Sequence, residues 1–528
     1  MQRTLSPLEA RTLPSLVLAA SQRFGERIAI EDGAIRLSFA ELAAAALRAS
    51  RAFLAAGVGP GDRVAIWAPN LSEWIVAALG LQGAGGVLVP INTRWKGAEG
   101  GYVLRKCRAR LLLTVGEFLG TRYPALLADE DLPALEAIVC LRGEAAGTLA
   151  WPEFLARGES VSEAAARARA DAISPDALSD LLFTSGTTGK PKGVMTTHAQ
   201  NLRAFGAWSE VVGLREGDRY LVVNPFFHAF GYKAGWLSCL LRGATVLPHL
   251  VFDVPAVLER VGRERISVLP GPPTLYQSIL AHPDRAKYDL SALRLAVTGA
   301  AAIPVELIQR MRLELGFETI ITGYGLTECC GIVSMCRFDD DPETIATTSG
   351  RAIPDTEVRC IDREGKETPR GEPGEVVVRG YNVMQGYFED EDETRKTIDA
   401  EGWLHTGDVA VMDERGYLRI TDRIKDMFIT GGFNCYPAEI ESLLFGLEGV
   451  AQAAVIGIPD ERLGEVGKAF IVLRAGAALT PATVIAWCRE HMANYKVPRA
   501  VEIVDALPIN ASGKVMKFQL RERSQSQA

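Results

Sequence analysis

Along the chain, stretches whose hydrophobic and polar positions suit helices alternate with short apolar runs that suit strands. This pattern predicts strand-helix units. Between Leu37 and about Val139, helical stretches such as "FAELAAAALRASRAFLAAGV" are separated by short β-branched runs such as "RVAIWAP" and "GGVLVPIN". The pattern resumes later with "RYLVVNPFF", "ATVLPH", "ISVLPGPP" and "LRLAVTGAA". Short, continuously apolar strands are typical of sheets that helices cover. We therefore expect an α/β fold with a large N-terminal domain of helix-covered β-sheets.

The pattern changes near residue 420, where a smaller unit is predicted. Beyond "LRITDRIKD" come a helical "YPAEIESLLFGL", strands "AAVIGIPD" and "KAFIVLRAG", a helix "TPATVIAWCREHM" and a last strand "VEIVDALP". Elements in this order, after a polar connector, favour a small α+β domain of about 100 residues. We place the boundary at Lys425, so that residues 1–424 form an N-terminal domain and residues 425–528 a mobile C-terminal domain.

Composition and charge favour an ordinary soluble globular protein over a nucleic-acid or membrane protein. The 528 residues are 48% hydrophobic and 23% charged, with a net charge of -8, which argues against a nucleic-acid surface. The first 25 residues predict an amphipathic helix and no signal peptide. The longest apolar stretch, Trp74 to Ile91, is interrupted by Gln82 and several glycines, so a buried helix-turn-strand is expected there. We expect a cytoplasmic protein without integral membrane association, and leave open whether it forms a homodimer.

The cysteines predict neither a zinc site nor a disulfide framework. All nine are scattered along the chain, and no CxxC pair occurs. Reduced, partly buried thiols are the expectation for a cytosolic chain.

A loop rich in glycine and threonine follows the apolar run from Leu181 to Phe183. Its sequence, "TSGTTGKPKG" from residue 184 to 193, combines backbone N–H groups, hydroxyls and lysines, which suits phosphate binding. The spacing is not that of a Walker loop, because Lys190 is followed by Pro191 instead of Ser or Thr. No GxGxxG follows a strand and opens a helix, so a dinucleotide dehydrogenase is excluded.

Further polar stretches follow this loop, and their order resembles a known family. They are "NPFFHAFGYKAG" (224–235), "TGAA" (298–301), "GYGLTE" (323–328), "GWLHTGD" (402–408), "DRIKD" (422–426) and "LPINASGKVMK" (507–517). Together with the loop they resemble the adenylate-forming superfamily of acyl-CoA synthetases, luciferases and peptide-synthetase adenylation domains. The resemblance covers nearly the whole chain, and the combination of motifs is highly specific.

The resemblance implies an acid-thiol ligase reaction in two steps. A carboxylate attacks the α-phosphate of Mg-ATP, which releases pyrophosphate and leaves an acyl-adenylate; the coenzyme A thiol then gives the thioester and AMP. The implied cofactor is Mg²⁺. ATP and coenzyme A are the implied co-substrates, and the third substrate is a small carboxylic acid. The first step requires neutralisation of charge on a crowded phosphate and little covalent work by the protein.

The resemblance assigns the nucleotide site residue by residue. Glu328 would be the Mg²⁺ ligand and Thr327 an α-phosphate donor, whereas a lone Glu328 would more often be a solvated or capping carboxylate. Asp408 and Arg423 would bind the ribose, although as isolated residues they also suit a structural ion pair. The expected ATP-binding residues are Thr184, Ser185, Gly186, Thr187, Thr188, Gly189, Lys190, Lys192, Gly299, Ala300, Ala301, Tyr324, Asp408 and Arg423.

The C-terminal motif supplies the remaining implied roles. Lys514 would be the catalytic lysine of adenylation, together with Glu328 and Thr327, although a C-terminal lysine is usually only solvated. Lys425 matches the family's hinge position, so that a rotation there would move the small domain between the two steps. Gly431 and Gly432 would lie against the pantetheine arm of coenzyme A.

The acyl substrate is predicted from the stretch that contains His228. The resemblance places His228 and Phe230 at the acyl site, whereas a lone histidine beside aromatics is more often a core residue. Lys233 would lie near the pocket wall, facing a ring ketone, with a solvent-exposed side chain as the alternative. The runs "NPFFHAFGYKAG", "LPGPPTLYQSIL" and "GGFNCYPAEIE" resemble the CoA ligases of bacterial steroid catabolism, whose substrate is the methylated indanedione propanoate HIP. Fatty acids of medium or long chain and aryl acids are the alternatives.

Other classes remain to be weighed against a CoA ligase. A peptide-synthetase module would need a carrier domain, and the chain ends at Ala528, so we do not expect one. A luciferase-like oxygenase shares all these motifs. A non-catalytic homologue should have lost at least one of Glu328, Asp408, Arg423 and Lys514, and all of them are present.

Overall fold

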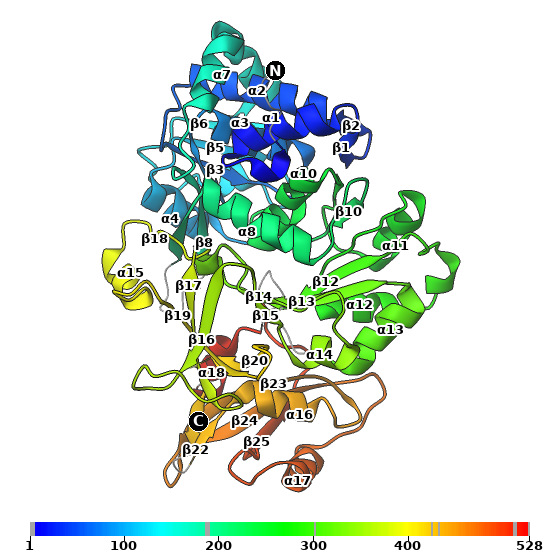
Figure 1. The fold of residues 1–528 in the computed structure, drawn as a ribbon. Helices are drawn as coiled ribbons and strands as arrows, with labels where there is room; N and C mark the ends of the chain where they lie inside the picture. Colours follow the sequence, from blue (N-terminus) through cyan, green and yellow to red (C-terminus); the bar gives the residue numbers. More distant parts are fainter. Residues whose placement is uncertain are drawn as a thin grey trace.

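The computed structural model describes residues 6–184, 191–299, 303–423, 426–430, 433–509 and 515–525, and it contains the predicted strand-helix units. Strands and helices alternate through the first half of the chain, and a smaller unit, orange to red, lies at the lower end of the molecule (Figure 1). The fold is therefore α/β with a large N-terminal and a small C-terminal domain, as predicted.

The largest sheet has eight strands and carries the hairpin of the phosphate loop. Its order is β18-β9-β8-β4-β3-β5-β6-β7. In this order, each pair of neighbouring strands from β8 to the β7 edge is parallel. Strand β9 runs antiparallel to both β8 and β18. The bounds are β3 (Arg63–Trp67), β4 (Val87–Pro90), β5 (Leu111–Val115), β6 (Ala137–Arg142), β7 (Leu149–Ala150), β8 (Leu178–Thr184), β9 (Lys192–Thr197) and β18 (Gly386–Tyr387).

Two four-stranded sheets lie beside it, with the orders β10-β11-β1-β2 and β12-β13-β14-β15. The stretch "ISVLPGPP" was predicted to be a strand, and this is wrong: Val268 makes only isolated bridges, to Tyr220 and Leu295. Prolines 270, 272 and 273 cannot donate to a ladder, which explains why no strand extends there. The bounds are β1 (Ile28–Asp32), β2 (Ile35–Ser38), β10 (Arg219–Val222), β11 (Thr245–Pro248), β12 (Leu295–Gly299), β13 (Thr319–Tyr324), β14 (Ser334–Met335) and β15 (Arg351–Ala352).

An antiparallel sheet of order β16-β17-β19-β20 connects this part to the small domain. Its bounds are β16 (Thr356–Ile361), β17 (Pro373–Gly380), β19 (Leu404–Met412) and β20 (Leu418–Arg423). Asp408 in β19 is paired directly with Arg423 in β20. The two expected ribose-binding positions therefore lie on neighbouring strands.

Helices cover the sheets, and local sequence explains where they begin. In α2 (Phe39–Ala55), Ser38 accepts from the backbone N–H of Glu41 and the Glu41 carboxylate accepts from that of Ser38, which forms a capping box. Helix α3 (Ser72–Gly83) and β4 form the buried helix-turn-strand predicted between Trp74 and Ile91. Within the described residues, no helix has the length and apolar character that crossing a membrane requires. The others are α1 (Leu13–Phe24), α4 (Gly97–Cys107), α5 (Tyr123–Leu126), α6 (Trp151–Arg157), α7 (Glu163–Asp171), α8 (His198–Val211), α9 (Ala229–Gly231), the π-helical turn η3 (Tyr232–Leu237), α10 (Ser238–Arg242), α11 (Val254–Arg263), α12 (Pro273–Ala281), α13 (Val305–Leu315), α14 (Pro342–Thr347) and α15 (Glu391–Thr397).

The C-terminal domain is a five-stranded sheet with helices and its own hydrophobic core, formed among others by Ile440, Val455 and Ile471. A hydrophobic core of its own identifies this unit as a domain distinct from the N-terminal one. The exact boundary stays a prediction, because Lys425 lies outside the described residues. The bounds are β21 (Phe428–Thr430), β22 (Phe433–Cys435), β23 (Val450–Asp460), β24 (Gly464–Leu473), β25 (Ala500–Ile503), α16 (Pro437–Leu444), α17 (Pro481–His491) and α18 (Lys517–Gln525).

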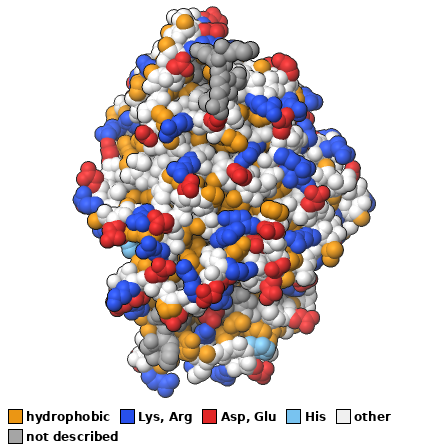
Figure 2. Space-filling view, in the orientation of Figure 1, with side chains coloured by type: hydrophobic (Ala, Val, Ile, Leu, Met, Phe, Trp, Pro, Cys, Tyr) orange, Lys and Arg blue, Asp and Glu red, His pale blue; other side chains and the backbone are white. Residues whose placement is uncertain are grey.

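The surface and the thiols fit the composition of the chain. Acidic and basic side chains are interspersed over the face shown in Figure 2, with hydrophobic side chains scattered between them. All nine cysteines are buried. Burial raises the pKa of several of them, for example that of Cys330 to about 12, so these thiols stay protonated and unreactive near neutral pH.

Candidate active site

Strands β8 and β9, which flank the predicted phosphate loop in the sequence, pair as an antiparallel hairpin. Thr184 and Lys192 are paired opposite each other where the two strands reach the loop. The loop residues themselves, 185–190, lie outside the described residues. Lys192 forms an ion pair with Glu393 of α15, and its ammonium lies 5.1 Å from the centre of the Tyr387 ring. Lys192 is thus held at the mouth of the hairpin by residues far along the chain.

Tyr387 contacts both this lysine and Glu328, the expected magnesium ligand. The Tyr387 hydroxyl donates to Glu328 Oε1 at 2.9 Å. Burial and the Glu328 carboxylate raise the pKa of Tyr387, so its hydroxyl remains a donor. Thr327 opens the short turn that contains Glu328. Tyr387 therefore places the carboxylate of Glu328 and the ammonium of Lys192 on one site.

The described residues test whether magnesium fits here. Among them, no group of three or more His, Cys, Asp or Glu side chains could hold a metal ion by itself. A single carboxylate at Glu328 agrees instead with the arrangement in which Mg²⁺ is shared between one protein ligand, substrate phosphates and water. Magnesium bound in this way would neutralise charge on the phosphates.

The residues expected at the nucleoside end lie on β12, β13 and β19, which belong to two sheets. The Tyr324 hydroxyl donates to Asp408 Oδ2 at 2.5 Å, although the two residues are 84 positions apart. Gly299 is paired with Gly323, and a Cβ at Gly299 would lie 2.7 Å from the Gly323 carbonyl oxygen. The small residue at position 299 is thus required by the approach of β13 itself. Tyr324 therefore contacts Asp408 and directly follows the residue paired with Gly299, whereas Ala300 and Ala301 lie outside the described residues. That these residues bind the nucleotide stays a prediction.

His228 and Phe230 lie at the start of the helical segment that follows β10. The His228 side chain is exposed, and its Nδ1 accepts from the backbone N–H of Phe230 at 3.2 Å. The alternative that His228 is a core residue is wrong. Its position at the N-terminus of α9 leaves the imidazole accessible to a substrate.

Lys233 differs from both expectations for it. Its side chain is 0% exposed, so the solvent alternative is wrong, and it presents no accessible surface to a ring ketone. The ammonium pairs with the Asp180 carboxylate at 3.1 Å and donates to Thr196 Oγ1 at 3.0 Å. A buried ammonium needs a partner, and the protein supplies it here. Sequence reasoning identified the need for a partner but not Asp180.

Several expected residues cannot be placed, and others were missed. Tyr387, Glu393 and Asp180 were not predicted, and nothing in their local sequence marks them, because their partners are distant in the chain. The Arg423 side chain and the positions Ser185, Gly186, Thr187, Thr188, Gly189, Lys190, Lys425, Gly431, Gly432 and Lys514 lie outside what the structure describes.

Comparison with known proteins decides the family. The profile of "AMP-binding enzyme" matches residues 17–388, and that of "AMP-binding enzyme C-terminal domain" matches residues 439–514. The chain belongs to the AMP-binding enzyme family. Two relatives named 3-[(3aS,4S,7aS)-7a-methyl-1,5-dioxo-octahydro-1H-inden-4-yl]propanoyl:CoA ligase match it. The Rhodococcus jostii protein is 53% identical over 97% of this chain and 98% of its own, and that of Mycobacterium tuberculosis 50% identical over 97% and 99%.

A solved structure supports the same family for this AMP-binding enzyme. The anthranilate CoA ligase AuaEII in complex with anthranoyl-AMP superposes with a TM-score of 0.86, at 30% identity, covering 97% of each chain. ATP and coenzyme A as substrates fit the family. The two profile matches fall on the two predicted domains.

The Lys192–Glu393 pair leads to a prediction for ATP binding to this AMP-binding enzyme. Hydrogen bonds from Lys192 and Lys396 lower the pKa of Glu393 to about 2, so the carboxylate is charged. If Lys192 binds ATP as predicted, this carboxylate would compete with the phosphates for it. Glu393→Gln should lower KM for ATP by about two- to fivefold, since a partly exposed ion pair is weak. Steady-state pyrophosphate release at varied ATP measures this.

A matched control comes from the same helix. Glu391 pairs with Arg395 on the exposed side of α15, with 89% of its side chain accessible, so Glu391→Gln should leave KM for ATP unchanged. A rise in KM for ATP on Glu393→Gln would mean that this carboxylate orients Lys192 for ATP instead of competing with it.

Proposed function

We propose that this protein is an AMP-forming acyl-CoA ligase that activates the indanedione propanoate HIP. The observation that supports the substrate is the 53% identity, over 97% of the chain, to a ligase named for that propanoyl compound. The motifs "NPFFHAFGYKAG" and "GGFNCYPAEIE" support the same subfamily. The protein would act in the cytoplasm without integral membrane association.

The site supports the adenylation step of this reaction. Glu328 would hold Mg²⁺, which would neutralise charge on the ATP phosphates, and Thr327 would donate to the α-phosphate. Asp408 and Arg423 bind the ribose, and Tyr324 with Gly299, Ala300 and Ala301 binds the adenine end. Thr184, the 185–190 loop and Lys192 bind the β- and γ-phosphates, where lysines and backbone N–H groups offset negative charge. His228 and Phe230 bind the acid.

The second step requires the small domain to move. Lys514, from residues 425–528, stabilises the charge that develops during adenylation, and the thiol must later reach the same carbonyl. A rotation at Lys425 would change which face of the small domain points towards the N-terminal domain. Gly431 and Gly432 would then lie against the pantetheine arm of coenzyme A. Residues 1–424 hold ATP and the acyl group throughout.

The experiment that tests the function measures AMP formation that depends on both ATP and coenzyme A. The acids are HIP, saturated fatty acids of graded length, and aryl acids including anthranilate. We expect kcat/KM for HIP to exceed that for every other acid by about 10²-fold, because a bicyclic substrate fills a pocket that flexible chains do not. The thioester is identified by mass.

Each other result has a definite meaning. A preference for alkyl or aryl acids would overturn HIP as the substrate and keep the ligase mechanism. Light emission with a luciferin in oxygen, without thioester formation, would favour the luciferase-like alternative. Absence of AMP with every acid would favour a non-catalytic homologue.

A further inference from the structure

A fully buried ion pair lies behind the candidate active site, on residues to which the proposed mechanism gives no role. Asp180 and Lys233 are both 0% exposed. Lys233 Nζ lies 3.1 Å from Asp180 Oδ1, and Thr196 Oγ1 bridges them, donating to Asp180 Oδ1 at 2.6 Å and accepting from Lys233 at 3.0 Å. The charges are thus paired and hydrogen-bonded out of contact with solvent.

The remaining lone pairs of the carboxylate are also used. Asp180 Oδ2 accepts from Ser179 Oγ at 2.7 Å, from Asn201 Nδ2 at 2.6 Å and from the Tyr232 hydroxyl at 3.4 Å. Gln82 Nε2 in turn donates to the Tyr232 hydroxyl at 3.0 Å. Burial and the Asp180 carboxylate raise the pKa of Tyr232, which keeps this hydroxyl protonated as a donor. Both oxygens of the Asp180 carboxylate are thus hydrogen-bonded, whereas Gln82 Oε1 and Asn201 Oδ1 accept no hydrogen bond within the described residues. The bonds to the carboxylate fix the elements that carry them relative to one another.

The network joins the two halves of the candidate active site. Asp180 in β8 and Thr196 in β9 are paired across the hairpin whose tip is the phosphate loop. Lys233 belongs to η3, which follows directly on α9, and α9 begins after His228. One ion pair therefore connects the strands that lead to the ATP phosphates with the helical segment that leads to the acyl site.

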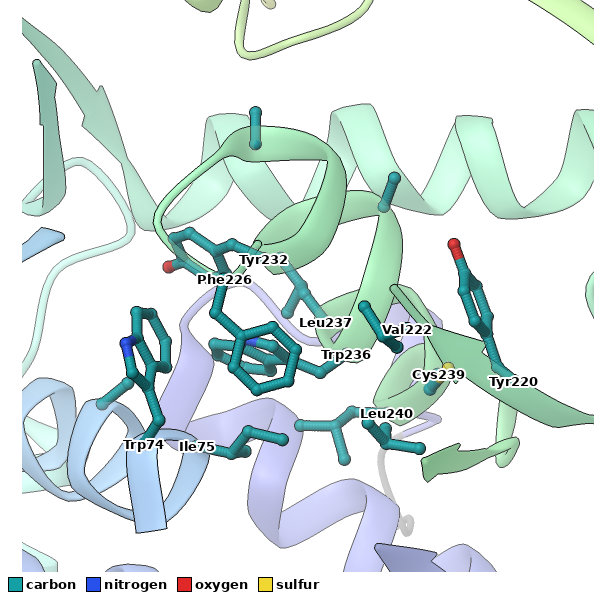
Figure 3. Close-up of a cluster of buried hydrophobic side chains, with 14 of the residues drawn as sticks. Trp74, Ile75, Tyr220, Val222, Phe226, Tyr232, Trp236, Leu237, Cys239 and Leu240 are labelled. Carbon is teal, nitrogen blue, oxygen red and sulfur yellow. The ribbon is translucent and has the colours of Figure 1, made fainter. Parts of the chain in front are cut away.

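The same helical segment contacts the turn that contains Glu328. A Cβ at Gly331 would lie 2.9 Å from the Ala229 Cβ, so the loop after Glu328 packs directly on α9. On its opposite side the segment is fixed by aromatic rings, which Figure 3 shows together: Tyr232 stacks on Trp236 at 4.8 Å, and Trp74 lies 6.1 Å from each. The aromatic cluster holds the segment in the core, whereas the ion pair sets its position relative to β8 and β9.

A buried ion pair is a poor source of stability, because desolvation of both charges offsets their attraction, and apolar replacements of similar volume are often equally stable. A role other than stability is therefore sought for the pair. The reaction supplies one, since a displacement of about 1 Å between reacting groups can cost about 10²-fold in rate.

We propose that Lys233 is a positioning residue: its ion pair with Asp180 sets the distance between the acid carboxylate, bound near His228, and the ATP held by the β8–β9 hairpin. Lys233 touches neither substrate. This inference rests on the proposed ligase function and deepens it, because it assigns alignment of the acid with the α-phosphate to a pair outside both substrate sites.

The test compares half-reactions in a double variant. Lys233→Met with Asp180→Asn removes both charges together, so no unpaired ion is left in the core. We expect kcat for pyrophosphate release to fall by at least tenfold, with KM for ATP and for the acid within threefold of wild type. Thioester formation from supplied acyl-adenylate should stay within threefold, since the acyl-phosphate bond is then already formed. The acid used is whichever the wild type turns over best, so the result does not depend on HIP.

A second ion pair supplies the control. Arg294 and Asp218 pair with 11% and 3% of their side chains exposed, just before the start of β12, whereas the site lies at its other end. Arg294→Met with Asp218→Asn should change thermal stability but leave both half-reactions unchanged. Thr196→Val is a milder variant of the network, and it should lower kcat for adenylation by about three- to tenfold.

Two results would overturn the proposal. Wild-type rates of both half-reactions in the Lys233 and Thr196 variants would show that the pair acts on stability alone. A raised KM confined to acids with a ketone would show that Lys233 binds the substrate. Failure of the wild type to adenylate any acid would instead disprove the ligase function itself.

Discussion

Lys514→Ala is expected to slow acyl-adenylate formation by about 10²–10³-fold, the usual cost of losing one group that stabilises charge in a transition state. The family pattern places this lysine at the α-phosphate and the acid carboxylate, two anions that approach each other during attack. A cation that acts only there changes kcat more than KM. Thioester formation from supplied acyl-adenylate should stay within about threefold of wild type, since the small domain then presents another face.

Separate assays of the half-reactions measure this, with pyrophosphate release for the first and thioester mass for the second. Lys517→Ala is the matched control, because Lys517 lies three positions away and forms an ion pair with Glu441 at 2.8 Å inside the small domain. It should leave both steps near wild type. Equal loss of both half-reactions in Lys514→Ala would contradict a role confined to adenylation.

The α/β fold could be predicted because its signals are local. The capping box at Ser38 and Glu41 marks the start of α2, and the run of apolar residues through α3 and β4 marks elements buried on every side. The prolines of "ISVLPGPP" were overlooked, although missing N–H groups decide against a strand whatever the apolar pattern. Strand order between distant segments, such as β18 beside β9, has no local signal and was not predicted.

The expected site residues could be named because the family motifs mark them, but their partners could not. Glu328, Lys192 and Asp408 all lie in recognisable motifs, and each is placed by a tyrosine or carboxylate from a distant element. Tyr387 is 59 positions from Glu328, and Glu393 is 201 positions from Lys192. Such pairs depend on how strands are ordered in the sheet. The sequence alone therefore identifies the residues but does not show which of them are in contact in the folded protein.

Lys233 shows the limit most clearly. Its residue type and its place near the predicted pocket wall indicated correctly that an ammonium buried there would need a partner. The sequence offered the substrate as that partner because the stretch lies in an acyl-site motif. The partner is Asp180 in β8. Asp180 directly precedes the apolar run Leu181 to Phe183, and no motif in its local sequence indicates a function. Chemistry predicted the need, and only the fold identified what meets it.

Asp408→Asn should lower kcat/KM for ATP by about 10²-fold, because each charge-assisted hydrogen bond to a ribose hydroxyl contributes about 1.5–3 kcal/mol. Asp408 is 6% exposed in β19, and the Tyr324 hydroxyl donates to its Oδ2 at 2.5 Å. One carboxylate oxygen is thus oriented by the protein. Removing the charge weakens every bond that the ribose donates to this group.

Deoxynucleotides make the test specific. Wild type should use 2′-deoxy-ATP and 3′-deoxy-ATP about tenfold less well than ATP, whereas Asp408→Asn should discriminate much less, since mutation and missing hydroxyl remove the same interaction. Tyr324→Phe is the control: it deletes the hydroxyl that orients Asp408 but keeps the carboxylate, so discrimination should persist with a smaller loss of rate. Losses that simply add between Asp408→Asn and the deoxynucleotides would place the ribose hydroxyls elsewhere, because groups that interact directly do not act independently.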